Sequence, residues 1–279
     1  MDNKITNKIH VAIRGTEYNQ NEIKIPENAQ NLMKFLEKNY GFYDLTFVTT
    51  RVYNIFMLGM DKQNRMLFIK SGRHPELYKN EYVMGRALWE IDHDHFLEPL
   101  YYSDKGEFFF FANEIMMGES LQLIADLGKL KTMPADKKMV LLRDLHKIFL
   151  DLKKSDVVHR DIRPDNFAVI NDRLYLIDFQ LAVSKSHYEE LESLTIGRIR
   201  GLGTAEYRYK LWHWDDSYSL LKCAKFIGCP APQYREEYNK ICHDIKSYIG
   251  HDVILSAKRE NGLQRLWRHV LRKLTKKKH

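Results

Sequence analysis

The chain has 279 residues, enough for one large domain or for two units that share a cleft. Its hydrophobic content of 44% and charged content of 29% are those of a soluble globular protein, and no apolar run approaches the roughly 18 residues that span a membrane. The net charge of +7 comes wholly from residues 265–279, which include seven lysines or arginines and no acid and leave 37 basic and 37 acidic residues elsewhere.

Residues 1–45 are predicted to form an N-terminal extension that packs on the residues after it. A helix is expected over 29–38, because Pro26 and polar residues precede it and Gly41 follows it. The first residues lack the apolar core of a secretory signal, which predicts a cytoplasmic protein. An odd number of cysteines without metal-site spacing predicts reduced thiols and no disulfide framework: Cys223, Cys229 and Cys242.

The next part of the chain predicts strands, one helix and a buried ion pair. Lys70 closes an apolar strand, and Pro75 opens a helix that extends to Ile91. Glu81 lies on the apolar stripe of that helix. Because a carboxylate that faces the core requires a cation, we expect an ion pair between Lys70 and Glu81.

Two further strands are expected around 97–102 and 107–116, followed by a helix that begins near Ser120. A longer helix begins after Pro134. Its apolar residues recur with helical spacing: Leu141, Leu145, Ile148, Phe149 and Leu152. The order of elements therefore predicts a strand-rich part and then a mainly helical part.

Residues 157–182 hold the densest set of side chains suited to catalysis. Asp161 is followed five positions later by Asn166, and Asp178 lies twelve positions further on. Phosphoryl transfer needs a hydroxyl in line with the phosphate and cations that neutralise the developing charge. A carboxylate at Asp161 could orient the hydroxyl and take its proton, while Asn166 and Asp178 offer the oxygen ligands that Mg²⁺ prefers.

An apolar hairpin separates these two metal-ligand candidates. Strands over 167–170 and 174–177 are joined by a polar turn, Asn171-Asp172. This hairpin would bring Asn166 and Asp178 to the same end of the two strands. An ordinary hairpin with scattered polar residues is the alternative, but the coincidence of four residue types at fixed offsets favours a catalytic site.

The run His159, Arg160 and Asp161, followed by Asn166 and Asp178, resembles the catalytic stretch of the protein-kinase-like superfamily. The resemblance implies an α+β fold of two lobes. The small lobe, residues 46–116, would contain an antiparallel sheet and one helix. Residues 117–262 would form a mainly helical catalytic lobe.

The resemblance also implies ATP and Mg²⁺ as cofactors and assigns the catalytic roles. Asp161 and Arg163 would be catalytic, with Arg163 stabilising the transferring phosphoryl group. Asn166 and Asp178 would bind the metal ion. One departure is Gln180, which stands where the family usually has a glycine, and it argues against a large in/out flip of this segment.

The nucleotide contacts implied by the resemblance lie in the strand-rich part. Lys70 matches the lysine that holds the phosphates, with Glu81 as its partner. Backbone groups from Glu114 to Met116 would meet the adenine, and Thr50 would lie in the turn over the phosphates. That turn lacks the glycines usual in the family.

Asp215 and Asp216 precede a predicted helix. One of them resembles the buried aspartate that supports the catalytic loop from below in the superfamily. The competing interpretation is a helix N-cap, and the sequence does not separate the two aspartates.

Residues 263–279 predict an amphipathic helix with Trp267 on its apolar side and an all-basic polar side. This pattern favours an anionic membrane surface, and so a peripheral location on the inner face of the membrane. A terminal helix packed on the large lobe is the alternative. Nucleic acid is the weakest candidate partner, because no aromatic residues interleave with the basic ones.

Two classes of acceptor remain open. The layout is similar to that of bacterial lipopolysaccharide-core heptose kinases, which implies transfer to a sugar hydroxyl of a glycolipid or polysaccharide. Arg160 favours instead a Ser/Thr protein kinase, with Ser193 or Thr195 as sites of activating phosphorylation. A catalytically inactive scaffold is a third class, suggested by the missing glycines and Gln180.

Overall fold

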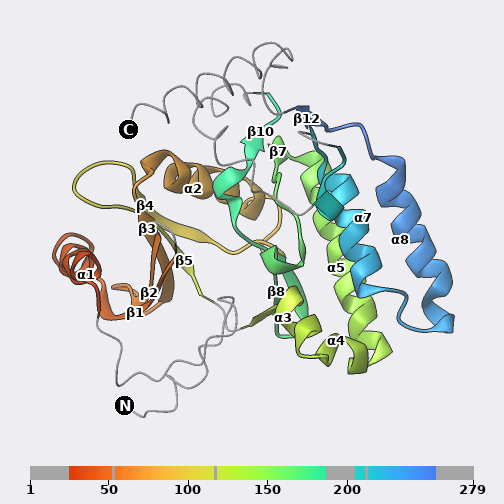
Figure 1. The fold of residues 1–279 in the computed structure, drawn as a ribbon, viewed down its shortest axis with the longest axis horizontal. Helices are drawn as coiled ribbons and strands as arrows, with labels where there is room; N and C mark the ends of the chain where they lie inside the picture. Colours follow the sequence, from red (N-terminus) through yellow and green to blue (C-terminus); the bar gives the residue numbers. More distant parts are fainter. Residues whose placement is uncertain (1–24, 52–53, 116–117, 187–204, 211–212, 256–279) are drawn as a thin grey trace, which may run out of the picture.

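The computed structural model shows an α+β fold, in which a five-stranded antiparallel sheet precedes a mainly helical part (Figure 1). The structure describes residues 25–51, 54–115, 118–186, 205–210 and 213–255. The strand order in the sheet is β1-β2-β3-β5-β4. The strands are β1 (Tyr43–Arg51), β2 (Asn54–Met60), β3 (Met66–Gly72), β4 (Pro99–Ser103) and β5 (Phe109–Glu114).

Helix α1 (Glu27–Tyr40) covers one face of this sheet. It includes the predicted helix and extends two residues further at each end, and Gly41 ends it in the left-handed conformation with φ 67°. Leu32 and Leu36 pack against apolar side chains of the sheet, including Leu67 and Ile69 of β3. Since side chains alternate along a strand, Phe68 and Lys70 face the opposite side.

Helix α2 (Pro75–Trp89) packs on that opposite side, against β4 and β5. Pro75 is at its first turn, as predicted, and Glu81 is buried. Ile91, expected on the apolar stripe, lies beyond the helix and is exposed. The helix thus presents one carboxylate toward the interior beside the sheet.

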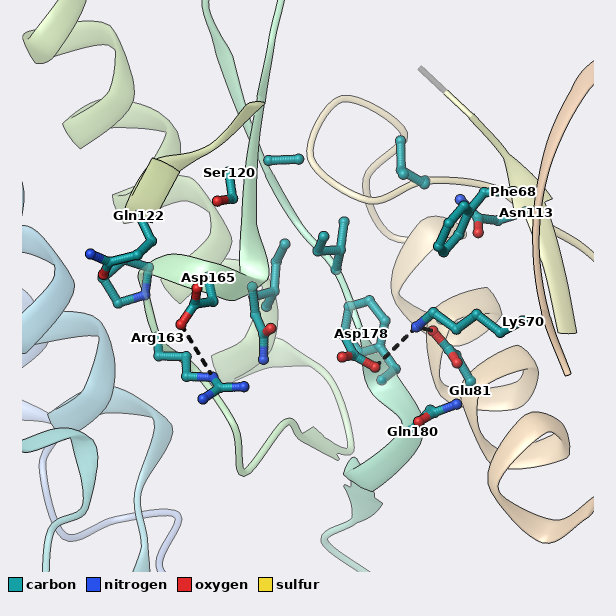
Figure 2. A pocket seen from close by; sticks show the side chains of 18 of the residues that line it. Phe68, Lys70, Glu81, Asn113, Ser120, Gln122, Arg163, Asp165, Asp178 and Gln180 are labelled. Atoms are coloured by element: carbon teal, nitrogen blue, oxygen red, sulfur yellow. Dashed lines mark hydrogen bonds and ion pairs between the residues drawn. The ribbon is translucent and has the colours of Figure 1, made fainter. Parts of the chain in front are cut away.

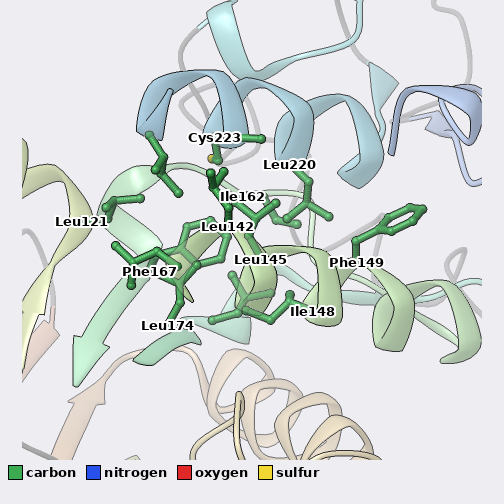
Figure 3. Close-up of a cluster of buried hydrophobic side chains, with 14 of the residues drawn as sticks. Leu121, Leu142, Leu145, Ile148, Phe149, Ile162, Phe167, Leu174, Leu220 and Cys223 are labelled. Carbon is green, nitrogen blue, oxygen red and sulfur yellow. The ribbon is translucent and has the colours of Figure 1, made fainter. Parts of the chain in front are cut away.

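The mainly helical part is built around α5 (Ala135–Lys154), the helix predicted after Pro134. Its apolar face forms one buried cluster with the short hairpin and α7 (Figure 3). The other helices are α3 (Leu121–Asp126), α4 (Lys129–Thr132), α7 (Asp216–Ile227) and α8 (Arg235–Ser247). Within the residues described, no helix is both long and apolar enough to cross a bilayer.

The predicted hairpin is present as β8 (Phe167–Ile170) and β9 (Arg173–Leu176). Asn171 and Asp172 have φ values of 49° and 63°, which are typical of the type I′ turn that the sequence indicates. Strand β6 (Glu119–Ser120) pairs with β8. Gly118, just before β6, must be a glycine, because a Cβ there would lie 2.5 Å from the Val169 carbonyl oxygen.

Short elements complete the fold around the hairpin. The strands β7 (Val157–Val158) and β10 (Val183–Ser184) pair with each other, as do β11 (His213–Trp214) and β12 (Ile254–Leu255). Short 3₁₀ helices are η2 (Pro164–Asn166), η3 (Phe179–Leu181), η4 (Ala205–Tyr207) and η5 (Pro232–Tyr234). The β7–β10 pair joins the two ends of the segment that contains Asp161 and Asp178, and the β8–β9 hairpin lies between these two residues.

Candidate active site

A cavity of about 1210 Å³ lies between the sheet and the mainly helical part (Figure 2). Phe68, Lys70 and Asn113 line it from the sheet, and Ser120 and Gln122 line the opposite side. Small-molecule sites commonly have volumes of roughly 300–1,000 Å³. The cavity therefore has room for two reactants side by side.

Lys70 makes two ion pairs at the sheet side of this cavity. Its Nζ lies 2.7 Å from Oε1 of Glu81 and 3.1 Å from Oδ1 of Asp178. The Lys70–Glu81 pair is the one predicted from the sequence, and Asp178 is a second partner that the sequence did not indicate. Strand β3, helix α2 and the residue after the hairpin thus converge on one ammonium group.

The three charged groups of this cluster differ in exposure and in the direction of their pKa shifts. Burial raises the pKa of Glu81 to about 7, because the lost hydration outweighs the attraction of Lys70. Burial opposes the charge on Lys70, but Asp178 and Glu81 together hold the pKa of Lys70 above its ordinary value. Burial also acts to raise the pKa of Asp178, yet Lys70 holds it below its ordinary value. The Glu81 side chain is 3% exposed and that of Asp178 39%, so Glu81 takes up the first proton.

Asp161 is held by two neighbours in the loop before the hairpin. The Nδ2 of Asn166 donates to the Asp161 backbone oxygen at 2.7 Å and to Oδ2 at 3.0 Å. The Nε of Arg163 forms an ion pair with Asp161 Oδ1 at 3.5 Å. Because the amide nitrogen of Asn166 is bound to Asp161, the amide oxygen is the atom that Asn166 can offer to a cation.

Asp216 supports this loop from below. It accepts hydrogen bonds from the backbone N–H groups of His159 at 2.6 Å and Arg160 at 3.0 Å. Asp215 instead caps α7, because its Oδ1 accepts from the Tyr218 N–H at 3.1 Å. Asp216 is therefore the aspartate that supports the loop, and Asp215 is the helix N-cap.

The buried groups under the loop have shifted pKa values. Burial lowers the pKa of His159 to about 4, so its ring is neutral at pH 7. The ring Nε2 donates to the Ile177 carbonyl at 3.0 Å, and Nδ1 accepts from the Asp161 N–H at 3.2 Å. Burial raises the pKa of Asp216 to about 7 despite its two N–H donors. His159 thus joins the loop to the residue before Asp178 without carrying charge.

The residues after Asp178 are fixed to α2. Asp178 has a left-handed backbone with φ 73°, which aspartate tolerates better than most residues. Gln180 lies in the 3₁₀ helix η3, so the positive φ falls on Asp178 and not on Gln180. Asn80 of α2 shares its Nδ2 among the carbonyls of Phe179, Gln180 and Ala182, at 3.3, 3.1 and 2.7 Å. No sequence signal singled out Asn80.

Of the other predicted nucleotide contacts, Ile115 of the 114–116 stretch lines the cavity, whereas Thr50 and Glu114 do not. Thr50 is exposed and pairs with Ile55 in the β1–β2 ladder, and it does not line the cavity. Glu114 is also outside the lining, and its N–H donates to the Glu98 carbonyl at 3.4 Å. Met116 lies outside the described residues. At the start of β2, Asn54 lines the cavity, and its Oδ1 accepts from the Tyr78 hydroxyl at 3.0 Å.

The donor set fits a hard divalent cation bound together with phosphate. Lys70 lowers the pKa of Asp178, whose side chain is partly exposed, and Asn166 has an amide oxygen to offer. Mg²⁺ is typically bound by one or two protein oxygens, with waters and phosphate oxygens completing its shell. In the described part of the chain, no cluster of three or more His, Cys, Asp or Glu side chains is placed to hold a metal ion. A cation at Asn166 and Asp178 would therefore take its remaining oxygens from waters and a bound phosphate.

Comparison of the sequence with protein-family models and with curated proteins finds no match.

Proposed function

We propose that this protein is an ATP-dependent phosphotransferase with a two-lobed, kinase-like fold, in which the sheet with α1 and α2 is the small lobe. One observation carries the proposal. Lys70, Glu81 and Asp178 are joined by ion pairs of 2.7 and 3.1 Å at one cavity, and Asn166, which also lines it, is bonded to Asp161. A structural ion pair between Lys70 and Glu81 alone does not explain why Asp178 joins it and why Asn166 lines the same cavity.

Each residue then has a defined task. Lys70 binds the phosphates of ATP, and Glu81 fixes its position. Asn166 and Asp178 hold Mg²⁺, which neutralises charge on the phosphates when bound. Asp161 orients the acceptor hydroxyl and accepts its proton at a side-chain oxygen. Arg163 lines the cavity and contacts Asp161, which is itself 6% exposed and outside the lining, and Arg163 stabilises the negative charge of the transferring group.

The acceptor that we propose is a sugar hydroxyl, as in a lipopolysaccharide core or another glycolipid. The cavity supports this choice, because its volume admits a sugar beside the nucleotide. A protein Ser or Thr hydroxyl is the second candidate. We also propose that residues 263–279, which lie outside the described residues, bring the protein to an anionic membrane surface.

Transfer of labelled γ-phosphate from ATP with Mg²⁺ tests the proposal, with a glycolipid fraction and a protein extract offered side by side. Asp161→Asn keeps the shape of the side chain and removes its basicity, so transfer should fall by at least about 100-fold while ATP still binds. Asp172→Asn is the matched control, since Asp172 lies in the exposed hairpin turn and asparagine tolerates its positive φ.

Label in the glycolipid supports the sugar kinase, and label only in protein supports the second candidate. Undiminished turnover in Asp161→Asn would remove Asp161 from the mechanism. ATP binding without transfer to either fraction would overturn the enzyme proposal in favour of a scaffold.

A further inference from the structure

The cavity carries more negative than positive side chains. Its lining includes five carboxylates and two cationic groups, Lys70 and Arg163. The carboxylates are Glu81, Asp126, Asp165, Asp178 and Glu206. At the sheet side, Lys70 contacts Glu81 and Asp178, and these three groups are used in the proposed binding of Mg²⁺ and ATP. The remaining three carboxylates line the cavity away from Lys70.

These remaining carboxylates come from separate elements that meet at the helical side. Asp126 ends α3, Asp165 lies in η2, and Glu206 lies in η4. Helix α3 packs against η2, and η4 packs against α7. In Figure 2, Arg163 and Asp165 lie with Gln122 across the cavity from Lys70 and Glu81. This side is the place left for the acceptor once the nucleotide occupies the Lys70 side.

Few basic side chains among the residues that the structure describes neutralise the acceptor side. Arg163 is its cationic group, and Arg163 contacts Asp161 at 3.5 Å and Asp165 at 4.0 Å. Among the described residues, no salt bridge joins Asp126 or Glu206 to a basic side chain. Asp126 instead accepts a hydrogen bond from Gln122 at 2.8 Å, which orients its carboxylate at the rim.

Two aromatic rings complete this side of the cavity. Tyr207 follows Glu206 in η4, and Phe226 comes from α7; both are partly buried and line the cavity. Aromatic faces attract cations and also pack on the apolar faces of sugar rings. A phosphate or carboxylate on the acceptor would meet like charges here, whereas an ammonium group would meet carboxylates and ring faces.

We propose that the acceptor alcohol carries a positive charge, as an amino sugar or an amino alcohol does. This inference rests on the proposed kinase function and adds the charge class of its substrate. Asp126 and Glu206 select the ammonium group, and Tyr207 and Phe226 contact the ring or chain that bears it. Acceptors that are phosphorylated next to the reacting hydroxyl are rejected by the same carboxylates.

The test measures transfer of γ-phosphate by the full chain to matched acceptor pairs, each an amine and its N-acetyl derivative, beginning with glucosamine and N-acetylglucosamine. The ratio of kcat/KM within a pair reports the charge, because acetylation removes it and keeps the ring. We expect the amine to be preferred by about tenfold, if each of two carboxylates contributes severalfold as exposed ion pairs do. The preference should shrink at about 1 M salt, where charges are screened within roughly 3 Å.

Glu206→Gln and Asp126→Asn should each reduce that ratio by up to about fivefold. Glu37→Gln is the matched control, because Glu37 is an exposed residue of α1, on the other face of the sheet, and its removal changes the net charge equally. Its ratio should equal that of the unmodified protein.

Three results overturn or redirect the inference in distinguishable ways. If transfer depends on Asp161 but no amine exceeds its acetylated partner, the charge class is wrong and the kinase function stands. If a sugar phosphate is the best acceptor, the charge class is likewise wrong. If ATP does not bind at all, the proposed function itself fails.

Discussion

Replacement of Lys70 by methionine tests the charge cluster most directly, because it removes the cation and keeps the length of the side chain. Glu81 is 3% exposed and contacts Lys70 at 2.7 Å. Removing one partner of a buried ion pair destabilises a protein by about 3–5 kcal/mol, since the other charge stays buried. We therefore expect Lys70→Met to lower the free energy of unfolding by about this amount at pH 9.

The loss should depend on pH in a direction that the structure sets. Burial raises the pKa of Glu81 to about 7 in the folded protein, even with Lys70 present. Without Lys70, the pKa of Glu81 rises further, so the folded variant keeps a proton that the unfolded chain has released. Above pH 7, the free energy of unfolding of Lys70→Met should therefore fall relative to that of the unmodified protein by about 1.4 kcal/mol per pH unit, and below pH 6 the deficit should be small.

Urea unfolding followed by circular dichroism at several pH values between 6 and 9 measures both quantities. The double variant Lys70→Met/Glu81→Gln is the matched control, because it carries neither buried charge. It should recover much of the stability at pH 9 without recovering phosphotransfer. If the single variant parallels the unmodified protein from pH 6 to 9, or if the double variant is as unstable as the single one at pH 9, Glu81 is not the buried charge that Lys70 neutralises.

Two further predictions concern the support of the loop and the C-terminal end. Asp216→Ala removes the acceptor of the His159 and Arg160 N–H groups and should lower kcat by about 10-fold or more, because small displacements of catalytic groups are costly. Asp215→Ala, which uncaps α7, should lower the free energy of unfolding by about 1 kcal/mol with little effect on kcat. Equal kcat values for the two variants would contradict the assignment of the two aspartates. Deletion of 265–279 should abolish sedimentation with anionic vesicles and leave the thermal unfolding curve unchanged, whereas persistent vesicle binding would place the membrane contact elsewhere.

The sequence predicts best those features that depend on local periodicity and turn chemistry. The β8–β9 hairpin follows from two apolar runs and an Asn171-Asp172 turn, whose residues tolerate positive φ. The contact of Glu81 with Lys70 follows from one carboxylate on an apolar helix stripe. In both cases one pattern admits few arrangements, and the structure shows the expected one.

Features that depend on how distant elements meet were not predictable in the same way. Asp215 and Asp216 are adjacent and chemically identical, so only the approach of the loop decides which one supports it. Asn80 carries no motif, because its acceptors are backbone carbonyls about a hundred positions away. The acidic acceptor side exists only once α3 and η4 line one cavity, which brings Asp126 and Glu206 to the same space.

The Asn80 bonds restrict how the site can be switched. The two N–H groups of one amide are divided among three carbonyls of residues 179–182, so α2 and this segment are fastened together. If α2 swings outward, it carries Glu81 away from Lys70 and pulls on the residues directly after Asp178. The Asn80 amide therefore couples the two ion pairs of Lys70, so that a displacement of α2 that breaks one of them would also strain the other.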